Sequence, residues 1–153
     1  MGNTGIQLLT ALTGSLGFAL VFRLRARLLP WAALGGLLCF GSYMLLLRLM
    51  GLGFFTYLLA SAAAELYAEI LARLLRAPST LFSIPAVIPL VPGRILFYAM
   101  SAVVRNDWAK ASSYWTVAGM EMLAIATGMT LVWALVFMLR EVSRRMAARK
   151  NGR

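Results

Sequence analysis

Long apolar runs separated by short polar segments dominate the hydropathy pattern of the chain. Each run contains close to the ~20 residues that an α-helix needs to cross the hydrocarbon core of a bilayer. The pattern predicts an all-α integral membrane protein with about five transmembrane helices, in a single domain over residues 1–153. The expected spans are 4–22, 30–47, 54–72, 81–104 and 112–139, followed by a basic tail over 140–153.

The fourth run, 81–104, is apolar enough to lie in a membrane but is interrupted by prolines. The break consists of Pro85, Pro89 and Pro92, with Gly93 and Arg94 directly after. A proline removes one backbone N–H and clashes with the carbonyl four residues earlier. The carbonyls of Leu81, Pro85 and Ile88 are therefore expected to lose their helical partners. Such groups persist in a membrane only against other protein or beside water.

Pro92 and Gly93 suit the start of a new helix, with proline at its first position. At ~1.5 Å per residue this start lies about 18 Å into the span, near the middle of a ~30 Å core. The N–H groups of a helix start attract an anion, and many transporters hold anionic substrates on such half-helix ends. The break therefore predicts a substrate site that includes Pro85, Pro89, Pro92 and Gly93. The alternative is a kink that serves only packing.

Arg94 is the leading candidate for a functional charge. A basic side chain in mid-membrane costs from ~2.5 kcal/mol upward and usually faces the interior of the helix bundle. Two interpretations stay open: Arg94 binds a substrate carboxylate, or it forms a structural ion pair with Glu65 or Glu121. Tyr98, one turn further on, is expected either to hydrogen-bond the substrate or to anchor the helix at the membrane interface.

Glu65 and Glu69 lie on one small-residue face of the third run. Glu65 is far enough inside the span to carry a proton for coupled transport, or to act as the counter-ion of Arg94. Glu69 has Arg73 at the i, i+4 spacing of a helical pair, which favours an interfacial salt bridge. Glu121 shares a close-packing face of the fifth run with Ala124 and Gly128. It is expected to be either a structural polar group inside the helix bundle or a functional residue.

Small and hydroxyl residues also mark the first run at helical spacing. They are Thr10, Thr13, Gly14 and Gly17. Because small residues let membrane helices approach closely, this stripe is expected to face another helix.

Composition and charge agree with a membrane protein. The chain is 61% hydrophobic and only 13% charged, with a formal net charge of +10. Most basic residues fall in the 23–29 loop, the 73–80 loop and the tail, which five spans would place on one side. Since Lys and Arg favour the cytoplasm, the N-terminus is expected outside and the C-terminus inside. The tail is expected to touch anionic lipid, and no nucleic-acid partner is predicted.

Histidine is absent and Cys39 is the single cysteine. A disulfide within the chain is excluded, and histidine-based catalysis and zinc or haem sites are disfavoured. The chain is therefore expected to be no enzyme and to carry no cofactor or metal.

The proline-rich segment resembles that of a known transporter family. The residues that carry the resemblance are Pro78, Phe82, Pro85, Ile88-Pro89-Leu90-Val91-Pro92-Gly93 and Tyr98, after a helix rich in Ala and Leu. They are similar to the small five-span half of the threonine/serine exporter family. Chain length and layout match as well. The family usually has a small or apolar residue where Arg94 stands.

The resemblance implies that the chain is a half-transporter. Halves of this family are fused or split into a large and a small subunit, and one split pair is a bacterial succinate exporter. The expected function is the small subunit of a secondary exporter for threonine, serine or a small dicarboxylate such as succinate. It would work in the bacterial inner membrane with a larger transmembrane subunit, or as a homo-oligomer. An odd number of spans suits a second half of inverted orientation. The alternative is a structural or assembly subunit without substrate contact.

Overall fold

The computed structural model describes residues 4–151, and the regular structure in that range is entirely helical. The elements are α1 (Thr4–Val21), α2 (Leu29–Met50), α3 (Phe54–Leu75), α4 (Thr80–Val87), the 3-10 turn η1 (Ile88–Leu90), α5 (Gly93–Val104) and α6 (Trp108–Asn151). The predicted all-α class is confirmed. Residues 1–3 and 152–153 of the predicted domain lie outside the described residues.

Three helices are long and apolar enough to cross a membrane: α1, α2 and the Trp108–Ser143 part of α6. The segments Thr80–Leu90 and Gly93–Val104 together make a fourth candidate that is bent by 56°. Helix α3, which carries two glutamates and Arg73, is not among these candidates. Residues 4–151 therefore contain three to four candidate spans, while the five-span count and the orientation stay predictions.

Helix α6 is much longer than the predicted fifth span, 112–139. It begins at Trp108 and runs for 44 residues into the segment that was expected to be a separate tail. The tail sequence has no proline or glycine before Gly152, and Glu141 accepts a hydrogen bond from Arg145 at 2.8 Å, one turn away. Such i, i+4 pairs stabilise a helix after it leaves the apolar region.

The core of the fold lies where α3 packs against α2, α4 and α6. On α3, the predicted small-residue face is buried, including Ser61, Ala64 and Ala68. Opposite it on α6, a Cβ atom at Gly128 would overlap the Leu58 carbonyl and the Ser61 hydroxyl. The absence of a side chain at Gly128 therefore sets how closely the two helices approach, as the close-packing face of the fifth run predicts.

The first run was predicted to pack on another helix through its stripe of small residues, and this prediction is only partly correct. Helix α1 packs on α2 through Ala11, Ser15 and Ala19, and Ser15 occupies the space where Gly36 has no side chain. The predicted stripe points elsewhere: Gly14 and Gly17 are exposed, with nothing within 4 Å of a Cβ built on either. Within the described chain, the stripe therefore does not face another helix.

The break in the fourth run lies further along than the first proline. Helix α4 continues through Pro85 and ends at Val87, so the prediction of a break at Pro85 is wrong. Pro85 is the sixth of the eight residues of α4, and because proline has no N–H it removes one helical hydrogen bond, the one to the Leu81 carbonyl. After η1, Val91 is extended and α5 starts at Gly93, with Pro92 at the cap position rather than inside the helix.

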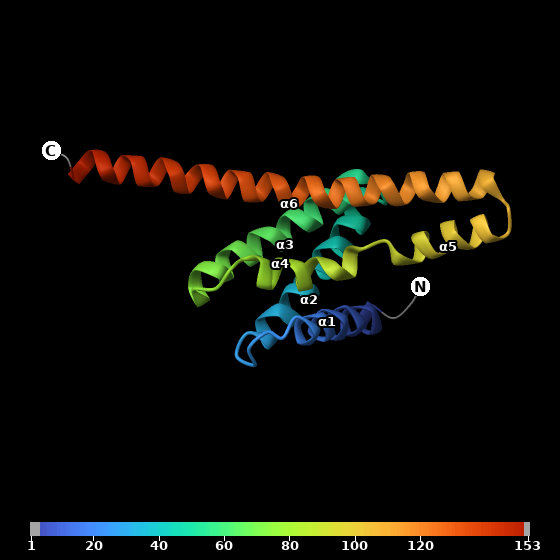
Figure 1. Cartoon of the computed structure of the whole chain (residues 1–153), viewed down its shortest axis with the longest axis horizontal. Helices are drawn as coiled ribbons and strands as arrows, with labels where there is room; N and C mark the ends of the chain where they lie inside the picture. Colours follow the sequence, from blue (N-terminus) through green and yellow to red (C-terminus); the bar gives the residue numbers. More distant parts are fainter. Residues whose placement is uncertain (1–3, 152–153) are drawn as a thin grey trace.

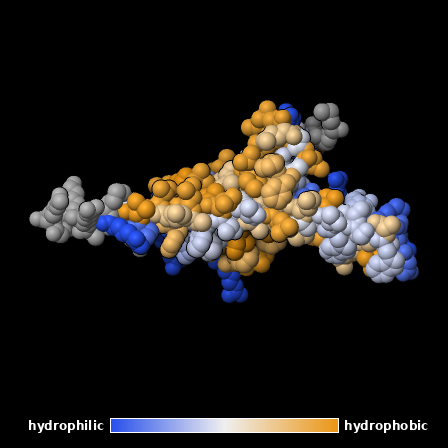
Figure 2. Space-filling model, turned by 90° about the horizontal axis from the view of Figure 1, so that it is seen from above, coloured by the Kyte–Doolittle hydropathy of each residue, from blue (hydrophilic) through white to orange (hydrophobic). Residues whose placement is uncertain are grey.

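Figure 1 shows how the break changes the direction of the chain. The α3–α4 turn lies at the left edge of the α1–α4 bundle, whereas the turn between α5 and α6 lies at the right-hand end of the molecule. Helix α5 extends away from the α1–α4 bundle and packs along the first half of α6. Seen from above, much of the surface is apolar and the charged residues gather mainly toward the edges and ends (Figure 2).

Candidate functional site

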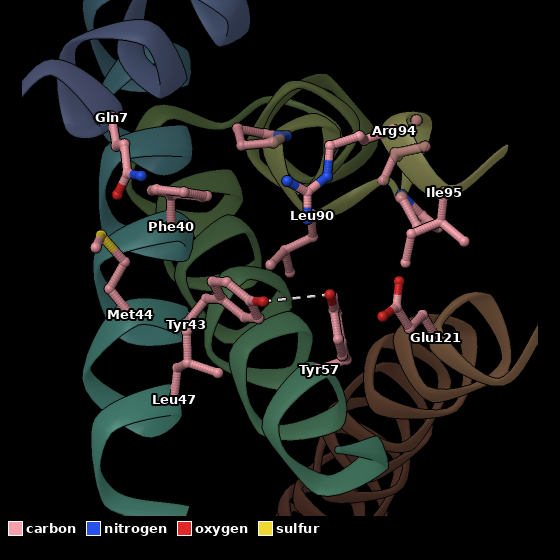
Figure 3. Close-up of a pocket in the computed structure, with 14 residues that line it drawn as sticks. Gln7, Phe40, Tyr43, Met44, Leu47, Tyr57, Leu90, Arg94, Ile95 and Glu121 are labelled. Carbon is pink, nitrogen blue, oxygen red and sulfur yellow. Dashed lines mark hydrogen bonds between the residues drawn. The ribbon is translucent and has the colours of Figure 1, made fainter. Parts of the chain in front are cut away.

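A cavity of about 410 Å³ lies beside the helix break. Residues from α1, α2, α3, η1, α5 and α6 line it, so it collects side chains from almost the whole chain (Figure 3). Four of the six residues predicted for the substrate site are in its wall: Pro89, Pro92, Gly93 and Arg94. Cavities between bundle helices are common positions for ligand sites.

The backbone at the helix break offers N–H donors to the cavity. The carbonyl of Ile88, whose usual i+4 partner would be Pro92, accepts the Val91 N–H at 3.1 Å instead and is therefore not available to a ligand as a free group. The Gly93 N–H is also used, in a 2.8 Å bond to the Val91 carbonyl. By contrast, the N–H groups of Arg94 and Ile95 have no backbone acceptor in the described chain. Both residues line the cavity, where such donors can hold an anion.

Arg94 and Glu121 place opposite charges in the same cavity, from α5 and α6. They do not form a salt bridge within 4.0 Å, so a direct Arg94–Glu121 pair is absent from the described structure. Glu121 is only 6% exposed, and its Oε2 atom has no hydrogen-bond partner in the part of the chain that the structure describes. Because a buried carboxylate without partners is unfavourable, this atom is a ready acceptor for a ligand.

Two tyrosines that the sequence reasoning missed complete the polar wall. The Tyr43 hydroxyl on α2 donates to the Tyr57 hydroxyl on α3 at 3.2 Å, and the Tyr57 hydroxyl in turn faces the Glu121 carboxylate (Figure 3). The rings of Tyr43 and Tyr57 are 5.0 Å apart. Neither residue belongs to a motif, and only their polar tips inside apolar runs could have indicated them. Gln7 of α1 adds an amide at the opposite wall.

Glu65 and Glu69 lie elsewhere, on the buried face of α3. Glu69 accepts a hydrogen bond from Arg140 of α6 at 2.5 Å. The expected partner, Arg73, forms no ion pair with it in the described structure, because Glu69 faces α6 across the packed interface. Glu65 is 5% exposed, lies near Ser83 and Glu69, and its Oε2 atom has no hydrogen-bond partner. Glu65 does not line the cavity and therefore does not face Arg94.

The remaining two predicted substrate residues also lie outside the cavity. Pro85 is fully buried in α4. Tyr98 points toward the turn between α5 and α6, where its ring lies 5.9 Å from that of Tyr114 and near Arg105 and Asp107. The rise of the helix explains this, because Tyr98 is four residues beyond Arg94 and therefore lies about 6 Å, roughly one turn, further from the break. Among the described residues, no three potential metal ligands come together.

An all-α, multi-pass chain with a proline-broken membrane helix and opposite charges around an internal cavity has the construction of a membrane transporter. A family profile described as "Threonine/Serine exporter, ThrE" matches residues 7–135. The match spans most of the chain, which therefore belongs to the threonine/serine exporter family. The resemblance seen in the proline-rich segment is confirmed. No curated protein and no solved structure matches the chain significantly.

Proposed function

We propose that this chain is one half of a secondary exporter for threonine, serine or a similar small amino acid, bound in the cavity as a zwitterion. Membership of the threonine/serine exporter family supports this class of substrate. The observation that carries the proposal is the pairing of charges in the cavity wall. Arg94 supplies a cation, and Glu121 supplies a buried carboxylate with an atom that lacks a partner.

The α-carboxylate of the substrate would bind to Arg94. A guanidinium presents several donors in a plane and matches a carboxylate geometrically. The free N–H groups of Arg94 and Ile95, at the positive end of α5, would add to the attraction. This position also explains why an arginine in an otherwise apolar helix is directed into the cavity.

The α-ammonium of the substrate would bind to Glu121. The Oε2 atom of Glu121 is buried and has no hydrogen-bond partner among the described residues, and an ammonium group would supply a donor. The hydroxyls of Tyr43 and Tyr57 lie next to this position. They can accept or donate to a side-chain hydroxyl, which threonine and serine have and alanine and valine lack.

A dicarboxylate such as succinate fits the same wall less well. Its second carboxylate would find no second arginine among the lining residues and would be repelled by ionised Glu121. The proposal therefore ranks an amino acid above a dicarboxylate.

The rest of the proposed architecture follows the sequence expectations. The chain would cross a bacterial inner membrane five times, with the less apolar helix α3 as the fifth span, and with its C-terminus inside. A larger transmembrane subunit of inverted orientation would complete the pathway. Glu65, buried beside the Glu69–Arg140 pair, would carry a proton if export is coupled to one.

The test is efflux of labelled threonine or labelled succinate from preloaded cells that express the candidate larger subunit, with and without this chain. We expect threonine efflux only when both chains are present and no dependence of succinate efflux on either. Efflux of succinate alone would reject the zwitterion site. Assembly of the two chains without efflux of either compound would favour the structural-subunit alternative.

A further inference from the structure

A hollow with a basic wall lies between the loop that joins α1 to α2 and the end of α3. Its volume is about 250 Å³. Arg25 and Arg27 line it from the loop, and Arg76 lines it from the position directly after α3. The other residues in its wall are leucines and an alanine, and among the described residues no carboxylate lines it. Both segments lie at the left side of the α1–α4 bundle (Figure 1), so residues far apart in the chain form one hollow.

Apolar contacts hold the loop in this position. Leu24 is buried, and Leu28 packs on the cluster around Phe82 of α4. The Leu28 N–H donates a 2.7 Å hydrogen bond to the Arg25 carbonyl, which closes a tight turn. Because the two leucines take the inner side of the loop, Arg25 and Arg27 are left exposed. The loop therefore presents its arginines at the surface while its leucines hold it beside the end of α3.

Arg76 occupies a backbone position that favours glycine. Its φ of 50° and ψ of 45° are left-handed, a conformation that is unfavourable for residues with a Cβ atom and common for the glycine that ends a helix. The N–H groups of Arg76 and Ala77 both donate to the Ala72 carbonyl. A cation is favourable at the negative end of a helix. That effect does not require the two further guanidiniums that line the same hollow.

The three arginines lack counter-charges from the protein. In the part of the chain that the structure describes, none of them forms a salt bridge. Like charges around one hollow repel one another, and a bound anion removes that repulsion. A preference for basic residues in cytoplasmic loops explains that they are present, but not that two separate segments bring them to one hollow. Guanidiniums match the oxygen atoms of a phosphate geometrically, so the hollow fits a phosphate group.

The position of the hollow selects a lipid as the source of this phosphate. Helices α1 and α2 are both long and apolar enough to cross a membrane, so the loop between them lies at a membrane surface, level with lipid headgroups. Leu74 also lines the hollow and is 71% exposed. An acyl chain would cover this leucine, whereas a soluble phosphate would leave it in water. We infer that the hollow binds an anionic phospholipid, with the three guanidiniums on its phosphate and an acyl chain along Leu74. This lipid site does not depend on the substrate proposed for the cavity.

The experiment titrates the purified full chain in detergent with phosphatidylglycerol and measures the dissociation constant by native mass spectrometry. The test variants are Arg25→Gln, Arg27→Gln and Arg76→Gln. The control, Arg23→Gln, removes one charge from the same loop, from a residue that does not line the hollow. We expect each test variant to weaken binding about fivefold, the triple variant about a hundredfold, and the control less than about twofold.

Arg76→Gly separates loss of lipid binding from loss of folding. Glycine is favoured at this left-handed position, so the variant should unfold at the wild-type temperature or above it in the absence of lipid. It should nevertheless bind phosphatidylglycerol as weakly as Arg76→Gln does. Retention of full binding by Arg76→Gly would overturn the site.

Three further results would also overturn the site. An equal loss of binding in Arg23→Gln would mean that the basic loop attracts anionic lipid only through its overall charge. Equal binding of phosphatidylcholine would mean that the arginines do not select an anionic headgroup. If inorganic phosphate bound as tightly as phosphatidylglycerol and displaced it, the hollow would be a site for a soluble anion.

Discussion

Arg140 donates a 2.5 Å hydrogen bond to Glu69 and thereby ties the distal part of α6 to the buried face of α3. The pair is asymmetric: the Glu69 side chain is 5% exposed and the Arg140 side chain 46%. Removing the arginine would leave a buried carboxylate without its counter-charge, which is the costly way to break an ion pair.

We expect Arg140→Gln to lower the free energy of unfolding by about 1–3 kcal/mol, less than for a fully buried pair because one partner is half in solvent. Thermal or denaturant unfolding in detergent measures this change. The matched control is Arg145→Gln, which removes the exposed Arg145–Glu141 pair on the same helix. Its effect should stay near 0.3–0.5 kcal/mol, roughly the value of exposed i, i+4 pairs. Equal losses in the free energy of unfolding for the two variants would show that burial of Glu69 adds nothing to the strength of its ion pair.

The approach of α6 to α3 at Gly128 gives a second prediction. Gly128→Leu should destabilise the chain strongly, because even the Cβ atom would overlap the Leu58 carbonyl and the two helices would have to separate. Overpacking of this kind typically costs about 1–3 kcal/mol. Gly119→Leu, on the same helix with nothing within 4 Å of its Cβ, should leave the unfolding temperature nearly unchanged. A stable Gly128→Leu protein would show that the helices are not in close contact.

The cavity predicts a selective effect of Glu121→Gln on ligand binding. The neutral amide should weaken binding of threonine at least tenfold, because the ammonium loses its counter-charge. Binding of a hydroxy acid of the same size without the amino group should change little or improve. Isothermal titration of the assembled exporter would compare the two ligands, and Arg94→Gln should weaken both. If Glu121→Gln weakened binding of both ligands equally, the amino group of threonine would not bind at Glu121.

Asp107 provides a prediction about pH at the turn between α5 and α6. Its carboxylate accepts hydrogen bonds from the Lys110 ammonium at 2.7 Å and the Lys110 backbone N–H at 3.2 Å, and these hold its pKa below the usual value of 3.8. The contribution of this contact to stability is therefore complete above the unfolded-state pKa. It is lost as the pH falls through the lower folded-state pKa.

Asp107 is the single aspartate of the chain, so carboxyl carbon NMR of aspartate-labelled protein in micelles reports its titration directly. The pKa of Asp107 should lie below 3.8 in the wild type and rise in Lys110→Ala. A wild-type value above 3.8 would mean that the contact with Lys110 is absent in solution.

The hydropathy pattern predicted the helical class and most helix positions because burial in lipid requires long apolar runs. It also predicted that Ser61, Glu65 and Glu69 share one face, since residues three and four apart are neighbours on a helix. Proline spacing singled out the segment around Pro92 and Gly93, and both residues line the cavity.

The sequence pattern did not predict contacts between residues that are far apart in the chain. Local spacing paired Glu69 with Arg73, whereas the structure pairs it with Arg140, 71 residues away. Tyr43 and Tyr57 come together only because α2 and α3 cross at that point. The stripe on α1 was predicted to face another helix, but within the described chain Gly14 and Gly17 are exposed and α1 packs through Ala11, Ser15 and Ala19 instead. Similarly, Tyr98 belongs to the same proline-rich motif as Arg94 but does not line the cavity.

Helix α6 has a mechanical consequence. It is unbroken from Trp108 to Asn151, and Glu121 in the cavity wall and Arg140 in the ion pair are both part of it. Nineteen residues of α-helix separate them by about 28 Å, close to the thickness of the hydrocarbon core. Because no break separates them, a tilt of α6 that moves Glu121 also moves Arg140. If α6 moves as a rigid helix, any closing of the cavity that shifts Glu121 also shifts Arg140 and changes the geometry of the Glu69–Arg140 ion pair.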